Sequence, residues 1–194
     1  MRHNSLVSLI TKLLVSAGCR DVVTEPLLLP TAGVTLSPGS NTADNARADV
    51  SARSIWNPLE RAFLDVRVYH AQAPSNRNLK NIPRARMYSH HEEQKKRAYN
   101  AWILEVERGV LTPLVFSTSG GMGKEAKTLF KRVAAKMANK TGQKYSETIT
   151  FIRKRLRFNL LKTTVIALRG YRGKPSPSSS TEISELDLNI ELIP

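Results

Sequence analysis

Apolar residues recur along the chain at spacings that predict alternating helices and strands. A first helix is expected over residues 6–17, where apolar positions follow helical spacing, and Gly18 is placed to end it. A strand is expected over residues 22–29. The next segment, residues 30–45, is rich in Pro, Gly, Ser, Thr and Asn, which is typical of a hairpin-like excursion.

Two short apolar runs then carry one aspartate each. They are residues 47–52, with Asp49, and residues 62–68, with Asp65. The two-residue period of a strand puts Asp65 and Arg67 on one face of a sheet. Antiparallel pairing of the two strands is expected, because only a short connection joins them. A buried carboxylate is costly unless its charge is compensated, and a divalent cation shared by both aspartates would compensate it.

The second half of the chain predicts a long loop, three helices and one strand. Residues 71–90 combine prolines, asparagines and basic residues without periodicity, which indicates a loop able to contact a phosphate backbone. A helix is expected over residues 92–108, with Glu92 set to pair with Lys95 or Lys96. A buried strand over residues 111–117 and two further helices follow, the last over 146–169. Their core faces are expected to comprise Ala126, Leu129, Phe130, Val133 and Met137, and then Ile149, Ile152, Leu156, Leu160 and Ala167.

A glycine-rich turn, residues 117–123, joins this strand to the helix after it. Free backbone N–H groups at such a turn can bind phosphate. The turn lacks the Gly-Lys-Ser/Thr ending of a P-loop and the spacing of a dinucleotide fingerprint, which disfavours a nucleotide site. Contact with a DNA backbone and a purely structural tight turn both stay open.

The charge of the chain indicates a polyanionic partner. The sequence holds 30 Lys and Arg against 16 Asp and Glu, a formal net charge of +14. All the basic residues lie at or before Lys174, so residues 1–174 hold 30 basic and 12 acidic side chains, a net charge of +18. Nucleic acid is the expected partner, because Lys and Arg that neutralise phosphates release counterions whatever the base sequence. A basic structural protein remains the alternative.

Length and cysteine content predict one intracellular domain. Residues 1–172 can share one core, and residues 173–194, rich in Pro, Ser and Thr and then acidic, are expected to be a disordered tail. Cys19 is the only cysteine, so a disulfide or zinc finger within the chain is excluded, which suits a reducing compartment. The apolar stretch near the N-terminus is too short for a membrane span. A soluble protein without a membrane partner is expected.

The predicted order of elements, αβββαβα, is that of restriction-like nucleases, an α/β fold with a mixed sheet flanked by helices, here with an extra C-terminal helix. Over residues 2 to about 172 the chain resembles the C-terminal region of reverse-transcriptase-like proteins of non-LTR retroelements. The resemblance implies a PD-(D/E)XK endonuclease domain that uses Mg²⁺ or Mn²⁺, acts in the nucleus and nicks target DNA. It also implies RNA and a reverse transcriptase domain of the same polypeptide as partners. The segments that carry the resemblance are residues 2–4, 46–52, 63–68, 95–99 and 112–121.

By this resemblance, Asp49 and Asp65 would hold the metal, and Lys95, or with less support Lys96, would be the catalytic lysine. Arg67 stands where many of these enzymes have a lysine. Since a guanidinium cannot act as a base at neutral pH, Arg67 is expected to stabilise charge or orient water instead. The residues expected to contact phosphates are Arg47, Arg77, Arg84, Arg86, Lys96, Lys124 and Arg153.

Two departures from the family pattern bear on activity. Ala48 replaces the usual proline, a residue that shapes the backbone and holds no metal. Related nucleases carry a glutamate on the first helix, near Ser5, where this chain has no carboxylate, so Glu25 is the candidate third metal ligand. Two alternatives to an active nuclease stay open. One is an inactive nucleic-acid-binding module on the same fold, and the other is a basic structural protein without a cleft, which would leave the aspartates exposed and apart. For the acid pair itself the plain alternative is that Asp49 is a turn or cap residue and Asp65 pairs with Arg67 or Arg61.

Overall fold

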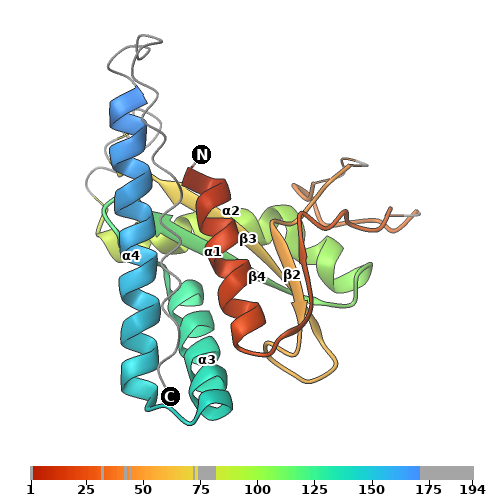
Figure 1. The fold of residues 1–194 in the computed structure, drawn as a ribbon. Helices are drawn as coiled ribbons and strands as arrows, with labels where there is room; N and C mark the ends of the chain where they lie inside the picture. The colour runs from red at the N-terminus through yellow and green to blue at the C-terminus, as the bar shows by residue number, and fades with distance from the viewer. Residues whose placement is uncertain are drawn as a thin grey trace, which may run out of the picture.

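The structure is a computed structural model that describes residues 2–31, 33–41, 43, 45–71, 73 and 82–170. Within these residues the chain forms a mixed α/β fold, a four-stranded sheet with four helices (Figure 1). The predicted tail lies almost entirely outside the described residues, as does Arg77. In chain order the elements are α1 (Arg2–Ser16), β1 (Arg20–Thr24), β2 (Val50–Arg53), β3 (Arg61–Tyr69), α2 (Arg84–Glu105), β4 (Val110–Ser117), α3 (Lys124–Thr141) and α4 (Tyr145–Gly170).

The sheet is mixed, with strand order β1-β2-β3-β4. β1 pairs with β2 and β2 with β3 in antiparallel fashion, which confirms the pairing predicted for the two aspartate runs. β3 and β4 are parallel over their whole length, from Ala62 opposite Val110 to Tyr69 opposite Ser117. A parallel pair needs a long crossover connection, and helix α2 is the helix of that connection.

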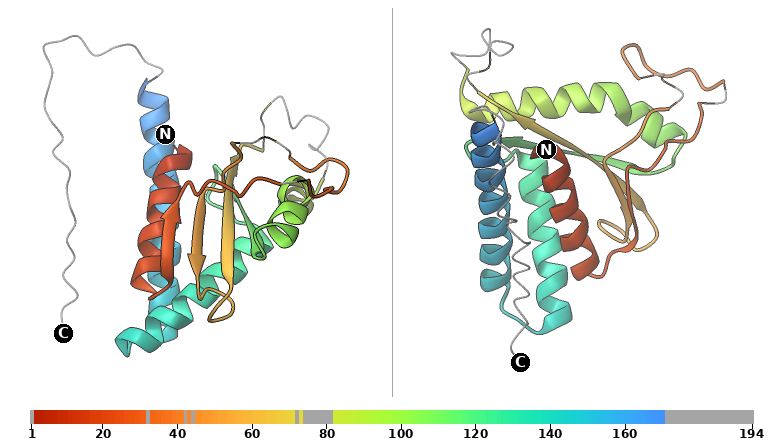
Figure 2. Two further views of the ribbon diagram at one scale, coloured as in Figure 1. Left: turned by 90° about the vertical axis from the view of Figure 1, so that its right-hand side faces the viewer. Right: turned by 45° about the horizontal axis from the view of Figure 1, so that its top comes forward.

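Helices cover both faces of the sheet (Figure 2). α1, α3 and α4 lie on one side, where Leu64 and Val66 of β3 join the largest apolar cluster. α2 lies on the other side, where Phe63 packs with Trp102 and Ile103 in a second cluster. The alternation of β3 therefore sends Asp65 and Arg67 towards α2, between the sheet and that helix.

Several predicted elements are confirmed, including the first helix and the strand over residues 111–117. The strand predicted over residues 22–29 ends at Thr24, because Glu25 takes a left-handed backbone conformation (φ 51°) and Pro26 follows it. Met137 is half-buried rather than buried. Ala167 is exposed, so the core face of α4 ends before it; Leu160 and Thr163 are its last buried residues.

The prediction of a loop over residues 71–90 is wrong from Arg84 onward, because α2 begins there, two turns earlier than expected. Pro83 supplies the fixed φ that suits a helix start, at −52°. Met87 and His91, one helical turn apart, are buried on the sheet side of α2. Among the described residues, no helix is both long and apolar enough to cross a membrane.

Candidate functional site

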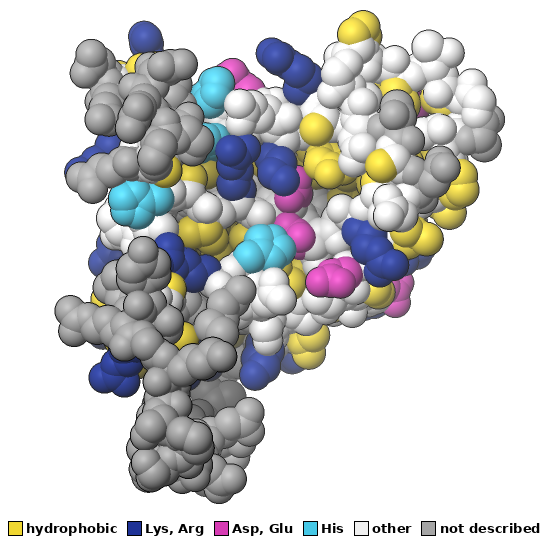
Figure 3. All heavy atoms as spheres, turned by 90° about the horizontal axis from the view of Figure 1, so that it is seen from above, with side chains coloured by type: hydrophobic (Ala, Val, Ile, Leu, Met, Phe, Trp, Pro, Cys, Tyr) yellow, Lys and Arg dark blue, Asp and Glu magenta, His cyan; other side chains and the backbone are white. Residues whose placement is uncertain are grey.

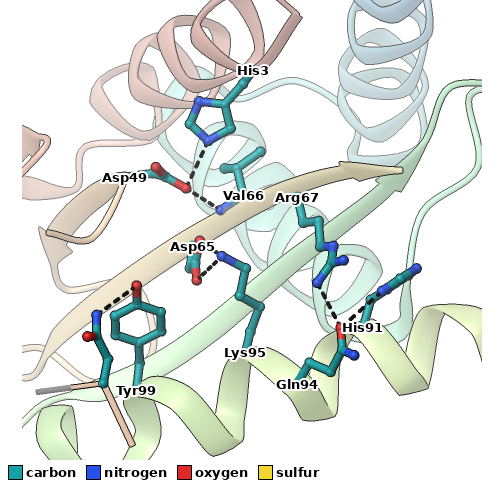
Figure 4. Close-up of polar contacts among 10 residues, drawn as sticks. His3, Asp49, Asp65, Val66, Arg67, His91, Gln94, Lys95 and Tyr99 are labelled. Atoms are coloured by element: carbon teal, nitrogen blue, oxygen red, sulfur yellow. Dashed lines mark hydrogen bonds and ion pairs between the residues drawn. The ribbon is translucent and has the colours of Figure 1, made fainter. Parts of the chain in front are cut away.

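Asp65 and Lys95 form an ion pair between the sheet and α2. Lys95 Nζ donates a hydrogen bond to Asp65 Oδ1 at 2.9 Å and lies 2.9 Å from Oδ2 (Figure 4). Both side chains are shielded from solvent, with 11% of the Asp65 side chain and 25% of the Lys95 side chain exposed. Asp65 and Lys95 are thirty residues apart in sequence, and the resemblance named both as site residues. The structure places them in direct contact.

Asp49 lies where β2 diverges from β3. Its backbone N–H donates to Leu64 O at 3.1 Å, and its side-chain Oδ2 accepts the N–H of Val66 at 2.5 Å. The carboxylate therefore takes the place that a backbone carbonyl would fill if β2 continued. In this position it is close enough to Asp65 to raise the pKa of that residue. The two carboxylates are thus neighbours that act on each other's charge.

The Asp65 carboxyl has a raised pKa of about 6. Burial is the main cause, because it disfavours the charged form. Lys95 opposes this effect and the Asp49 carboxylate adds to it. In addition, Asp65 Oδ2 is buried and makes no hydrogen bond within the described part of the chain. The Lys95 ammonium nevertheless lies 2.9 Å from this oxygen, so the site combines two carboxylates with one fixed positive charge. Carboxylate oxygens are also the ligands that a divalent cation prefers.

His3, on the first turn of α1, contacts Asp49. Its Nε2 lies 3.1 Å from Asp49 Oδ2 (Figure 4). Ser5, near the position where the resemblance implies a carboxylate, accepts a hydrogen bond from Asn159 of α4 at 2.9 Å instead. His3 is the residue of α1 that reaches the acidic pair. Its only sequence signal is its place in the segment 2–4 that carries the resemblance.

No contact between the Glu25 side chain and either aspartate is found among the described residues, so its role as a metal ligand stays a prediction. Its backbone N–H donates to Asp49 O at 2.9 Å, and its carbonyl accepts from Arg47 Nη1 at 3.4 Å. Its exposed side chain instead lines a groove of about 310 Å³ along α1. His3 and Lys12 line the same groove. Glu25 therefore positions the backbone of Asp49.

Arg67 lies on the same side of the sheet as Asp65 but makes a different contact. Its Nη1 donates to Gln94 Oε1 at 2.8 Å, on the helix that carries Lys95 (Figure 4). Gln94 also lies 3.5 Å from His91, whose pKa is lowered by burial first and by the Arg67 charge second. Arg67 thus places a fixed positive charge beside the acidic pair, without an ion pair to Asp65.

The glycine-rich turn is occupied by groups of the protein itself. Glu92 Oε1 accepts the backbone N–H of Glu125 at 3.1 Å, so the first turn of α3 has a carboxylate of α2 at its N-terminus. A Cβ at Gly123 would lie 2.1 Å from the same Glu92 oxygen. The structural interpretation of the turn is therefore favoured over a phosphate site. Of the two partners predicted for Glu92, Lys95 binds Asp65 instead, whereas the charge of Lys96 does act on Glu92 and opposes the effect of burial on its pKa.

The basic residues predicted to bind phosphates are all at the surface where the structure describes them. Two of them have partners in the protein: Lys96 Nζ pairs with Glu125 Oε1 of α3 at 2.5 Å, and Arg47 Nη1 donates to the Glu25 carbonyl at 3.4 Å. Figure 3 shows acidic side chains in the middle of one face, with histidine beside them and Lys and Arg around them. Besides Lys96, the exposed residues of the predicted set are Arg47, Arg84, Arg86, Lys124 and Arg153.

No three His, Cys, Asp or Glu side chains of the described residues form a ready-made metal-binding group. The donors nearest to such a group are the carboxylates of Asp49 and Asp65, with His3 next to them. Comparison with protein-family models and with curated protein sequences gives no match to this chain.

Proposed function

We propose that this chain is a metal-dependent DNA endonuclease domain of the PD-(D/E)XK type, which nicks target DNA for insertion of a retroelement. The observation that supports this most is the convergence of Asp49, Asp65 and Lys95 from three separate segments. The order of helices and strands and the mixed sheet are also those expected of such a domain. A nuclear location, and RNA or a reverse transcriptase as partners, belong to the proposal through the resemblance alone.

The chemistry of the residues fits a hard divalent cation. Asp49 and Asp65 offer carboxylate oxygens, the donors that Mg²⁺ and Mn²⁺ prefer, and the Lys95 ammonium lies 2.9 Å from Asp65 Oδ2. When bound, the cation would polarise the scissile phosphate and activate a water molecule. Asp65 is held ionised against the effect of burial by Lys95, which keeps it available as a ligand above pH 6.

Lys95 and Arg67 supply the positive charge that phosphodiester cleavage needs. Negative charge builds on the non-bridging oxygens as the nucleophile attacks, and fixed cations beside them lower the barrier. The Lys95 ammonium already lies at the acidic pair, so it is placed to stabilise this charge. Arg67, held by Gln94, would bind the phosphate as a positioning residue and would not exchange protons.

A plasmid-nicking assay tests this function. The purified chain should convert supercoiled plasmid to the open-circular form with Mg²⁺ or Mn²⁺ and not with EDTA. Asp65→Asn should abolish the reaction, whereas Asp21→Asn, an exposed aspartate of β1 paired with Arg53, should leave it unchanged. Nicking that persists in Asp65→Asn would rule out this site as the catalytic centre.

The rival function is an inactive nucleic-acid-binding module. It is favoured by one observation, that α1 brings His3 rather than a carboxylate to the acidic pair. In that case the wild-type chain would bind duplex DNA with the same salt dependence and show no metal-dependent nicking under any condition.

A further inference from the structure

We propose that His3 is a direct ligand of the divalent cation, together with Asp49 and Asp65, and that its imidazole makes the centre select Mn²⁺ over Mg²⁺. This inference rests on the proposed function, which requires a metal at the two aspartates. It adds a histidine as third ligand to the two carboxylates of Asp49 and Asp65.

The orientation of His3 is that of a metal-binding histidine. Its Nε2 faces the acidic pair, and its Nδ1 lies 3.3 Å from Asn4 Oδ1. A ligating histidine commonly donates its second ring N–H to an oxygen acceptor, which fixes the tautomer with a free lone pair on the metal side. Asn4 can supply that acceptor, which leaves the Nε2 lone pair directed at the site.

The distance between His3 and Asp49 also fits two ligands of one ion. In an octahedral site with metal–ligand bonds of about 2.1 Å, neighbouring donors lie about 3 Å apart. The separation of His3 Nε2 and Asp49 Oδ2 is 3.1 Å. When His3 Nε2 carries no proton, this nitrogen and Asp49 Oδ2 are both acceptors and their lone pairs repel. At this separation the two atoms therefore need to share a proton or a cation.

The third donor, Asp65, is available after a small adjustment. The donors among the described residues do not form a metal-binding group, and Lys95 Nζ lies 2.9 Å from each oxygen of Asp65. It donates its hydrogen bond to Oδ1, whereas Oδ2 is buried and makes no hydrogen bond within the described residues. Rotation of the Asp65 carboxylate would direct this oxygen to the cation while Lys95 keeps its contact with Oδ1.

The mixed set of donors decides which metal fits. Mg²⁺ binds oxygen ligands and retains water, so it gains little from an imidazole nitrogen. Transition-metal ions accept imidazole, and two carboxylates suit Mn²⁺. A site with two carboxylates and one imidazole should therefore bind Mn²⁺ more tightly than Mg²⁺.

Binding to the metal-free full-length chain tests the proposal without reference to catalysis. Free Mn²⁺ is measured by its electron paramagnetic resonance signal, and Mg²⁺ affinity by competition. We expect Mn²⁺ to bind at least about tenfold more tightly than Mg²⁺, and His3→Ala to weaken Mn²⁺ binding by about tenfold or more, the effect typical of losing a ligand's support. Mg²⁺ binding should change less than threefold, roughly, because it does not depend on the imidazole. His3→Asp should narrow the preference for Mn²⁺, because carboxylate ligands suit Mg²⁺ and Mn²⁺ alike.

A spectroscopic signal and a control residue make the outcome specific. Electron spin-echo spectra of bound Mn²⁺ should show modulation from a coordinated ¹⁴N nucleus in the wild type and not in His3→Ala. His90→Ala, an exposed histidine on α2, should leave both the modulation and the affinities unchanged. If Mn²⁺ binding is lost in Asp65→Asn but unchanged in His3→Ala, and bound Mn²⁺ in the wild type shows no nitrogen modulation, the role of His3 is overturned and the nuclease proposal still stands. Mn²⁺ binding that is unchanged when either aspartate is replaced would overturn both the role of His3 and the nuclease proposal.

Discussion

Replacing Asp65 with asparagine removes the central residue of the site. Relative to the wild type, the variant should nevertheless gain stability as the pH rises from acid to neutral. The change keeps the size of the side chain and removes its charge. In the wild type that charge is unfavourable, because burial raises the Asp65 pKa from 3.8 to about 6 even with Lys95 beside it. Residues that hold an unfavourable charge are characteristic of functional sites, whereas a structural ion pair stabilises its protein.

The magnitude follows from the pKa. Because the folded pKa lies above the unfolded value, the folded protein binds more protons between these pH values, and its stability falls as the pH rises through the window from 3.8 to about 6. Each tenfold change in proton affinity corresponds to about 1.36 kcal/mol, so the charged form of Asp65 costs the fold about 3 kcal/mol above pH 6. This cost is almost absent at pH 4.

Urea unfolding of wild type and Asp65→Asn, followed by circular dichroism in EDTA at pH 4 and pH 8, measures this cost. The free energy of unfolding of Asp65→Asn minus that of the wild type should rise by about 2–3 kcal/mol from pH 4 to pH 8. Packing differences between the two side chains are the same at both pH values and cancel. A difference that stays constant or falls with pH would mean that Lys95 fully compensates Asp65, and the pair would then be an ordinary structural ion pair.

Three further changes test other parts of the account. Lys95→Ala should lower the nicking rate about a hundredfold or more and leave DNA affinity nearly intact. Lys96→Ala should lower the rate less, because Lys96 pairs with Glu125. A larger effect of Lys96→Ala would place the catalytic lysine one residue later. Duplex DNA affinity should fall steeply with salt, and Arg153→Ala should reduce the slope of log affinity against log salt by about 1; an affinity independent of salt would argue against phosphate contacts. Gly123→Ala should destabilise the fold by about 1–3 kcal/mol in thermal or urea unfolding, because its Cβ would displace the Glu92 carboxylate that caps α3; unchanged stability would contradict that arrangement.

The elements predicted correctly are those with a clean apolar period. Residues 6–17 and 111–117 show such a period, and the short connection between the two aspartate runs was enough to predict antiparallel pairing. The start of α2 was missed because its buried positions include His91, which the apolar pattern does not count, and because arginines and polar residues surround Met87.

The sequence predicts a site residue only where that residue stands out within its own segment, as an acid does within an apolar run. Asp49 and Asp65 stand out because each interrupts an apolar run, and Lys95 came from the resemblance. His3 and Glu92 act through partners 46 and 33 residues away in sequence, Asp49 and Glu125. The spacing of residues within one segment cannot predict these contacts, because they form only when α1 packs beside the sheet and α2 beside α3.

The position of a bound metal ion tests the central claim most directly. Crystals of the chain grown with Mn²⁺ should show an anomalous scattering peak in contact with the carboxylates of Asp49 and Asp65, and crystals of Asp65→Asn should lack it. A peak at another place, or a wild-type crystal whose Asp49 and Asp65 bind no ion at Mn²⁺ concentrations that support nicking, would contradict a metal-dependent nuclease centre at this site.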